Sequence, residues 1–356
     1  MNARFALSTA ALLGAGLVGS AASAQYFEVF IEATQNIDGE GDFLDTNVVD
    51  GNDVYAFSRG TGGGPAVEGS LIKVTGFGSN AVPTVATTLA QWDAASDVDL
   101  AGSNGAVLLD TGDLRFVNFF DNSVYDIDPG TGTVTKFLDS SVFDALVGGG
   151  PVSIPVTNTV LSDGSGLAYD SAGDQLLAFD NDGDLAIALN NAELTAISGN
   201  DIISGGMAVV GTTLYYGSNT SDELYVVDLV AKTGSALLTT AQIEAVTDDI
   251  DGRAGFGDIF AGPDGLIYFY ETDSDYILSV DPTALDVAAS VSVVLSEADL
   301  VAGPAGSDSV GQFEWYFGDL AWTSAGRGFY SLNVPEPATA ALLGLGGLAM
   351  LRRRSA

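Results

Sequence analysis

The chain contains no histidine and no cysteine among its 356 residues. Without imidazole or thiol groups it cannot form a Ser-His-Asp triad, a cysteine nucleophile, a zinc site with thiolate or imidazole ligands, or a disulfide. Any catalysis would have to use carboxylates, tyrosine, lysine or an oxygen-ligated metal. Carboxylate-pair glycoside hydrolysis and calcium-assisted hydrolysis are therefore the enzyme classes that remain open.

Basic residues are also scarce: 11 lysines and arginines stand against 47 aspartates and glutamates, for a net charge of −36. This charge makes nucleic acid and anionic membrane surfaces poor partners. The carboxylates repel one another unless salt screens them or divalent cations neutralise them. An acidic surface that keeps an exported protein soluble is the simpler interpretation.

The C-terminal end carries an uncharged run of 14 residues, Ala338 to Leu351. This run is shorter than the about 20 residues that a helix needs to cross a bilayer. It follows Pro335, Glu336 and Pro337 and precedes Arg352, Arg353 and Arg354. The arginines would stay on the cytoplasmic side, and the prolines mark a non-helical break where a membrane enzyme could cut.

This arrangement closely resembles the PEP-CTERM sorting signal of bacterial surface proteins. The resemblance implies a sorting segment at residues 335–354, transient insertion of this tail into the inner membrane, and processing by an exosortase, a membrane-embedded transpeptidase. It also implies delivery to the cell surface or extracellular matrix, where exopolysaccharide or surface proteins would be partners.

The N-terminal end has the order of features found in a secretory signal peptide. Residues 1–4 form a short positive segment before an apolar stretch. Ala22, Ser23 and Ala24 then form an A-x-A cleavage site before Gln25. We therefore expect residues 1–24 to be a leader and residues 25–334 to form the mature domain.

The region between the two signals is predicted to be all-β, because short β-rich runs alternate with Gly, Asp, Asn and Pro. A turn followed by an aromatic-rich strand recurs at a mean spacing of about 55 residues, with strands at Val54–Phe57, Leu176–Phe179, Leu214–Tyr216, Leu266–Tyr270 and Gly328–Tyr330. In the second unit either Asn104-Gly105 or Thr111 to Asp113 supplies the turn. Further turns and strands give about four strands per unit. This organisation predicts a single six-bladed β-propeller, with a β-sandwich or a β-solenoid as alternatives.

The sixth unit is expected to stop after two strands, at Asn333. The alternating segment Tyr26 to Ala33 could supply its missing outer strand and so close the ring. The run Val124 to Pro129, followed by Thr131 and Gly132, loosely resembles secreted bacterial propellers of the NHL, lactonase and YVTN-like type.

Three aspartates are candidates for the mouth of the central channel: Asp99, Asp258 and Asp319. The alignment of the repeats places them on innermost strands, where converging carboxylates would offer a hard cation oxygen ligands only. In calcium-dependent lactonase-type propellers the metal lies in this region. The alternative, that these aspartates cap strand ends or accept turn amides, is favoured about twofold by the composition.

A second candidate metal site is Asp180, Asp182 and Asp184, whose alternate spacing around Gly183 resembles the first part of a calcium loop. The glutamate expected at its twelfth position is absent, since Asn191 stands there. A hairpin turn is the competing interpretation. The sequence specifies no cofactor with certainty, and calcium is the one these oxygen ligands would take.

The stretch Phe313 to Phe317 is the densest aromatic run, and with Trp322 it could stack on a sugar ring or pack between blades. No acid, base and nucleophile can be assembled from the sequence. The favoured hypothesis is thus a non-catalytic binding or scaffold propeller at the cell surface. The alternative is a calcium-dependent extracellular hydrolase of the lactonase type.

Overall fold

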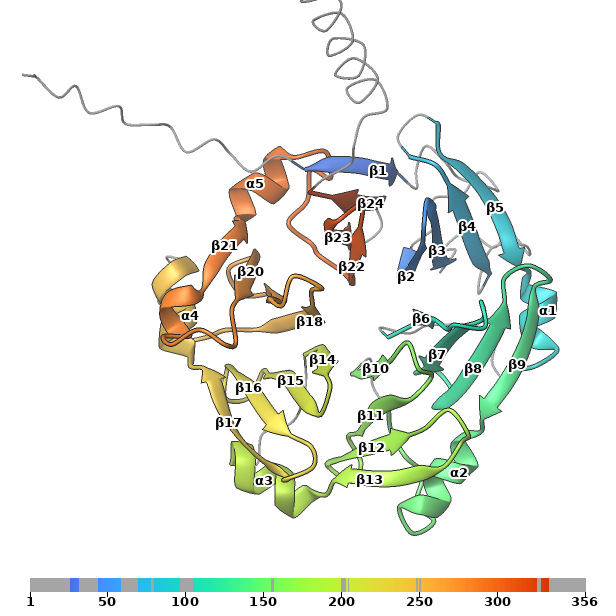
Figure 1. Ribbon diagram of the computed structural model, residues 1–356, viewed down its shortest axis with the longest axis horizontal. Helices are drawn as coiled ribbons and strands as arrows, with labels where there is room; N and C mark the ends of the chain where they lie inside the picture. Colours follow the sequence, from blue (N-terminus) through green and yellow to red (C-terminus); the bar gives the residue numbers. More distant parts are fainter. Residues whose placement is uncertain are drawn as a thin grey trace, which may run out of the picture.

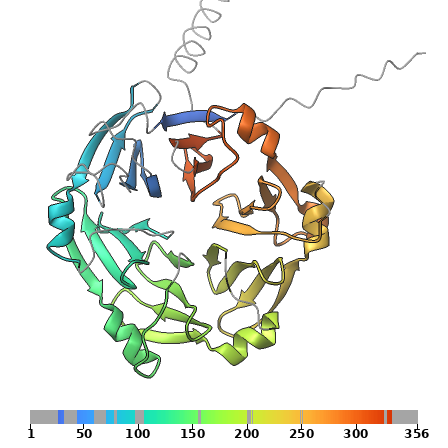
Figure 2. The ribbon, with the colours of Figure 1, turned by 180° about the vertical axis from the view of Figure 1, so that it is seen from behind.

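The computed structural model describes residues 26–31, 44–58, 70–77, 80–96, 105–154, 157–199, 203, 205–247, 249, 251–324 and 328–332. These residues form six four-stranded antiparallel sheets arranged as blades around a central axis (Figure 1). The predicted six-bladed propeller is confirmed, and the view from behind shows the same ring (Figure 2).

The strands follow one plan, with the first strand of each blade innermost. Blades 1 to 3 contain β2 (Leu44–Asp50), β3 (Asp53–Ser58), β4 (Leu71–Thr75) and β5 (Val82–Thr87), then β6 (Val107–Leu108), β7 (Leu114–Asn118), β8 (Ser123–Asp128) and β9 (Thr133–Leu138), then β10 (Asn158–Val160), β11 (Gly166–Asp170), β12 (Gln175–Phe179) and β13 (Leu185–Leu189). Blades 4 and 5 contain β14 (Met207–Val210), β15 (Thr213–Ser218), β16 (Glu223–Asp228) and β17 (Thr233–Leu238), then β18 (Phe256–Ala261), β19 (Ile267–Glu271), β20 (Tyr276–Val280) and β21 (Ser292–Leu295).

Blade 6 is assembled from both ends of the chain. It contains β22 (Phe313–Tyr316), β23 (Asp319–Ser324) and β24 (Gly328–Ser331), and its outer strand is β1 (Phe27–Ile31). The predicted closure by the N-terminal segment is confirmed. The expectation that the C-terminal part supplies only two strands is wrong, because Phe313–Tyr316 forms a third.

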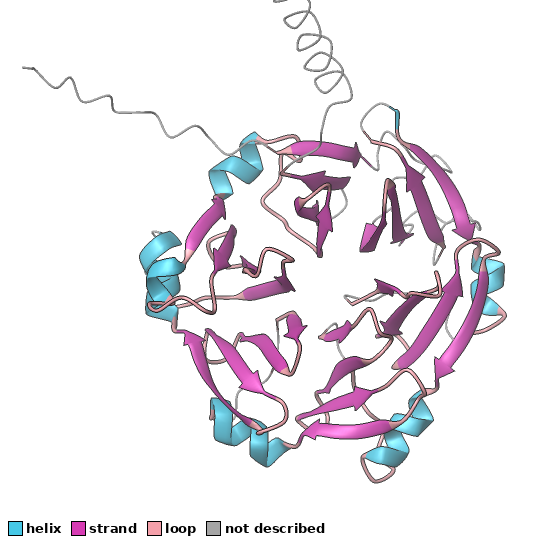
Figure 3. Ribbon diagram, in the orientation of Figure 1, coloured by secondary structure: helices cyan, strands magenta, loops and turns pink. Residues whose placement is uncertain are grey.

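Short helices lie on the outer perimeter between successive blades (Figure 3): α1 (Leu89–Asp93), α2 (Ser140–Leu146), α3 (Asn191–Ser198), α4 (Thr240–Thr247) and α5 (Glu297–Ala302). Each places one large buried hydrophobic residue into a blade junction: Trp92, Phe143, Leu194, Ile243 and Leu300. Ser296 caps α5 in a capping box with Asp299. The N-cap residue of α2 is Asp139, whose side chain accepts the backbone N–H of Ser141.

The core consists of six apolar clusters, one at each junction between neighbouring blades. Each sheet thus buries both of its faces, as the high apolar content of the strands requires. No blade can cover its faces alone, so the ring is stable only when its first and last blades meet.

Turns between strands use the residues that tolerate a left-handed backbone. Asn122, Asp222 and Asp275 have φ of 57°, 57° and 60° in the turns that link second and third strands. These are the Asp/Asn turns expected from the sequence. The undecided turn of blade 2 is the one at Thr111 to Asp113, which joins β6 to β7.

Candidate functional site

Asp258 lies on β18, the innermost strand of blade 5, as the sequence predicted. The strand register shifts between Phe256 and Ile259, so Asp258 sits in a bulge. Its Oδ2 atom accepts the backbone N–H of Phe313 at 2.7 Å, at the start of the innermost strand of blade 6. The carboxylate therefore joins blades 5 and 6.

Glu314 follows Phe313 on β22 and is the charged neighbour of Asp258. Both residues are half-buried. Burial raises the pKa of Asp258 to about 7, against the opposing effect of the Phe313 and Ile259 amides. Burial and then the charge of Asp258 raise the pKa of Glu314 to about 8. Two carboxyl groups that hold protons near neutral pH thus occupy adjacent innermost strands.

Asp319 is not on an innermost strand, and that expected position is wrong. It is the first residue of β23, directly after the turn formed by Phe317 and Gly318. Because every blade has four antiparallel strands, all innermost strands run in the same direction. Asp258 near the start of β18 and Asp319 after the end of β22 therefore lie toward opposite ends of the channel. Asp99 lies outside the described residues, and a ligand role for any of the three stays a prediction.

Asp180, Asp182 and Asp184 belong to the turn between β12 and β13, at the outer part of blade 3. Asp180 Oδ1 accepts the backbone N–H groups of Asp182 at 3.0 Å and of Asp184 at 2.9 Å. This carboxylate therefore organises its own hairpin. Calcium binding at this turn stays a prediction.

The same turn connects blades 2 and 3 through Arg115, which is only 3% exposed. Its guanidinium binds both carboxylate oxygens of Asp126 at 2.7 Å and donates to Gly164 O at 2.8 Å and Asn181 Oδ1 at 2.7 Å. The guanidinium also lies 3.5 Å from the centre of the Phe137 ring. The bidentate bond to Asp126 fixes the guanidinium within blade 2, and the bonds to Gly164 O and Asn181 Oδ1 link it to blade 3.

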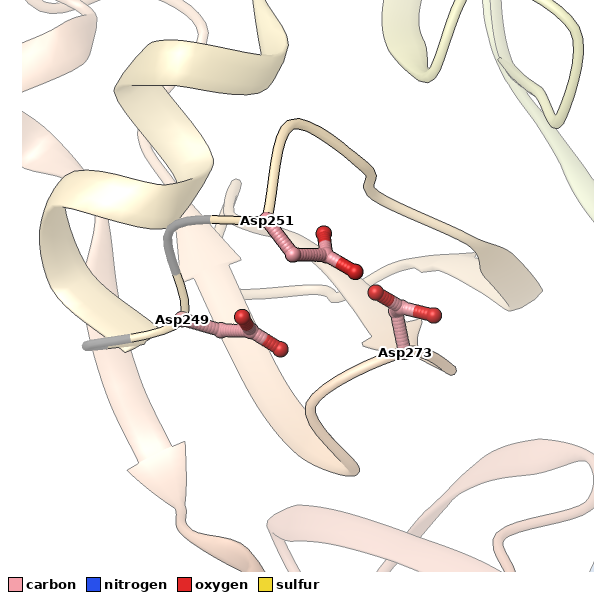
Figure 4. Close-up of side chains that lie close together, drawn as sticks. All are labelled: Asp249, Asp251 and Asp273. Atoms are coloured by element: carbon pink, nitrogen blue, oxygen red, sulfur yellow. The ribbon is translucent and has the colours of Figure 1, made fainter.

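One acidic cluster appears among the described residues: Asp249, Asp251 and Asp273, with a carboxylate oxygen of each within 4.8 Å of the others (Figure 4). Asp249 and Asp251 precede β18, and Asp273 lies in the turn after β19. Desolvation and the charges of Asp251, Glu271 and Asp249 raise the pKa of Asp273. Three carboxylates supply the oxygen donors that calcium prefers, but only part of its six to eight ligands.

The two ends of the propeller leave it side by side. Phe27 at the start of β1 pairs with Ser331 at the end of β24. Tyr26 is 6% exposed, donates its hydroxyl to Leu300 O at 2.8 Å, and packs against Trp322 with ring centres 5.0 Å apart. The predicted processing residues Ala22, Ala24, Pro335, Glu336, Pro337, Arg352, Arg353 and Arg354 lie outside the described residues.

The aromatic stretch of blade 6 belongs to the core. Phe313 is 2% exposed, and Tyr316 and Trp322 are fully buried. Trp315 lies 6.2 Å from the Tyr268 ring of blade 5. These contacts agree with packing between blades, the second interpretation of this stretch.

Comparison with protein families gives one match, and it falls directly after the last strand. Residues 333–355 match the PEP-CTERM protein-sorting motif. The PEP-CTERM motif implies export, processing by an exosortase and C-terminal sorting to the cell surface. None of the helices that the described residues form is both long and apolar enough for a membrane span.

Solved structures similar to the propeller include two gluconolactonases. One is from Xanthomonas campestris, with 11% identity, coverage of 82% of this chain and 86% of that chain, and a TM-score of 0.53. The other, a structural-genomics target with a provisional gluconolactonase assignment, has 14% identity, coverage of 87% and 92%, and a TM-score of 0.55. A protein of unknown function from Bacteroides thetaiotaomicron has 11% identity, coverage of 87% and 72%, and a TM-score of 0.53. These likenesses establish the fold, and no curated protein matches the chain.

Two residues of interest were not singled out by sequence reasoning. Glu314 stands inside an aromatic run that draws attention to stacking, although its position on an innermost strand is the signal that could have identified it. Asp273 joins the Asp249 and Asp251 pair only through folding, because 21 residues, including β18 and β19, separate it from Asp251.

Proposed function

We propose that this chain is an exported, exosortase-sorted protein of the cell surface or extracellular matrix, with a propeller that acts as a non-catalytic binding or scaffold module. The match of residues 333–355 to the PEP-CTERM motif, placed two residues after the last strand of a closed ring, carries this proposal. In this organisation residues 1–24 are the leader, residues 25–334 the mature propeller and residues 335–354 the sorting tail.

The candidate carboxylates form hydrogen bonds within the fold, and this supports a binding role over a catalytic one. Asp258 accepts a strand amide of the next blade, and Asp180 holds its own turn. A rigid ring with an acidic surface is suited to presenting loops to exopolysaccharide, to surface proteins or to divalent cations.

Mass spectrometry of the protein from its native surface tests the sorting part. We expect a new N-terminus at Gln25 and a new C-terminus near Pro335 to Pro337. Recovery of a chain that still ends in Arg354 or beyond at the cell surface would contradict processing. Co-sedimentation of the purified propeller with exopolysaccharide from the same cells tests the binding part.

A calcium-dependent hydrolase is the second candidate, and the Asp258 and Glu314 pair favours it. Paired carboxyl groups with raised pKa values are typical of acid-base sites. Turnover on a panel of lactones and glycosides, lost in both Asp258→Asn and Glu314→Gln and dependent on calcium, would establish this function. No turnover by the folded wild-type protein would leave the binding role as the better account.

A further inference from the structure

The end of the ring at which the innermost strands finish carries aromatic side chains that are not fully buried. Because each blade is antiparallel, the turns from first to second strand and from third to fourth strand all open at this end. Phe317 lies in the turn between β22 and β23 of blade 6, and Phe77 lies in the turn between β4 and β5 of blade 1. Both are half-buried, and their ring centres are 6.0 Å apart in an edge-to-face contact. The two rings form an aromatic pair across the junction of blades 6 and 1.

The backbone of Phe317 has a conformation that a bulky residue rarely adopts. Its φ is 50°, in the left-handed region, and Gly318 follows with a φ of 84°. The structure describes five other non-glycine residues with positive φ, and four of them are Asn or Asp, which tolerate this region. The turn would fold more easily with asparagine at position 317. The strained phenylalanine therefore points to a role for its ring at the surface.

A second half-buried aromatic side chain, Trp315, lies at the junction of blades 5 and 6 near the same end. It is the next-to-last residue of β22 and packs against Tyr268 of blade 5, with ring centres 6.2 Å apart. The Tyr268 hydroxyl donates to Asp264 Oδ2 at 2.7 Å. Burial and then the charges of Asp264 and Asp319 raise the pKa of Tyr268. Carboxylates of two blades thus lie around the tyrosine against which Trp315 packs.

This combination of groups suits an uncharged sugar chain. The faces of sugar rings carry C–H groups that pack on aromatic rings, and their edges carry hydroxyl groups that donate to carboxylates. An anionic polymer is disfavoured, because the chain has a net charge of −36 and Lys73 of blade 1 is already paired with Asp53 at 2.6 Å. Aromatic positions at two successive blade junctions match a ligand that repeats along its length.

We propose that this end of the propeller binds a neutral polysaccharide across blades 5, 6 and 1. Trp315 and the pair of Phe317 and Phe77 are the stacking surfaces, and Asp264 and Asp319 accept hydrogen bonds from sugar hydroxyls. The site rests on the binding role proposed above, and it specifies one end of the channel and an uncharged ligand.

Trp315 offers a direct spectroscopic readout of this site, because the other two tryptophans, Trp92 and Trp322, are fully buried. The full chain in a non-ionic detergent is titrated with exopolysaccharide from the same cells, separated by ion exchange into neutral and anionic fractions. Acrylamide quenching of tryptophan fluorescence is measured at each step. The neutral fraction is expected to reduce the quenching several-fold, and Trp315→Phe should remove the component that responds.

Two variants test the aromatic pair. Phe317→Asn removes the ring but keeps a residue that tolerates positive φ, so the turn is retained. Phe77→Ala removes the partner ring. Each should weaken binding of the neutral fraction about tenfold. Phe120→Ala is the matched control, because Phe120 is 39% exposed in the turn between β7 and β8, which opens at the opposite end, and its affinity should be unchanged.

The outcomes separate the site from the binding role. If the wild type binds the neutral fraction but its quenching is unchanged and both variants keep full affinity, the site is overturned and the binding role stands. A preference of the wild type for the anionic fraction would have the same meaning. A wild-type chain that binds neither fraction would overturn both. Thermal melting shows which variants are folded, and the quenching of the wild type decides the matter if Phe317→Asn is not.

Discussion

Tyr26 is expected to hold the ring closed, and its replacement tests this directly. Its strand contributes to both junctions of blade 6, since Tyr26 lies in the cluster shared with blade 5 and Val29 in the cluster shared with blade 1. The aromatic ring fits so closely against Gly303 that a Cβ atom there would lie 2.0 Å from it. Removing this side chain therefore leaves a cavity beside Gly303.

The expected cost of Tyr26→Ala is about 3–5 kcal/mol for the buried aromatic side chain. Tyr26→Phe keeps the ring but leaves Leu300 O without its hydroxyl donor, which costs about 1 kcal/mol. Urea unfolding of the propeller from Gln25 onward, followed by tryptophan fluorescence, measures both values. Phe120→Ala is the matched control, because Phe120 is 39% exposed and its removal is expected to change stability little.

The order of the three variants matters more than the absolute values. If Tyr26→Ala unfolds at the same urea concentration as Phe120→Ala, the N-terminal strand does not stabilise the ring. The interpretation of β1 as the closing element would then be refuted, whatever its pairing with β24.

Three further predictions follow from the described contacts. Glu314→Gln should raise the unfolding midpoint at pH 9 but not at pH 4. The pKa of Glu314 in the folded protein, about 8, lies above its unfolded value, so the wild type loses stability as the pH rises from about 4.5 to 8. A midpoint difference that is the same at both pH values would contradict this. Arg115→Met should lower the free energy of unfolding, measured in urea, by about 3–5 kcal/mol, because Asp126 loses its partner. Arg115→Lys should recover only part of this loss, since lysine cannot bind the carboxylate in a bidentate way. Asp273→Asn should raise the melting temperature in chelator at low salt, because it relieves repulsion from Asp249 and Asp251. This gain in melting temperature should shrink in high salt. A destabilised variant would show that the Asp273 carboxylate makes a contact that outweighs the repulsion.

The sequence was sufficient for the blade architecture because glycine and Asx turns alternate with β-rich runs at a regular spacing. It was not sufficient for the strand register. The strands beginning at Leu176 and Gly328 are third strands of their blades, whereas those at Val54, Leu214 and Leu266 are second strands. Each hairpin of a blade has the same local pattern of turn and apolar strand, so an alignment can slip by one strand without any local conflict.

This slip explains the error at Asp319. Phe317 to Leu320 has nearly the same sequence as Phe256 to Ile259, which lies on the innermost strand of blade 5. In the structure Phe317 and Gly318 adopt positive φ values of 50° and 84° and form the turn between β22 and β23. The innermost strand is the aromatic run before that turn. Glu314 was not identified as a candidate because its strand was not recognised as the innermost one.

The pairing of β1 with β24 has a further consequence for the time at which this protein can fold. Its closing contacts join Glu28 to Tyr330 and Phe27 to Ser331, which are 302 and 304 residues apart in the sequence. Such non-local contacts form late and slowly, after a large loss of chain entropy. A polypeptide threaded through a narrow export pore from its N-terminal end cannot complete the ring until β24 has emerged. The topology thus delays closure of the ring until both ends of the propeller lie on the same side of the membrane.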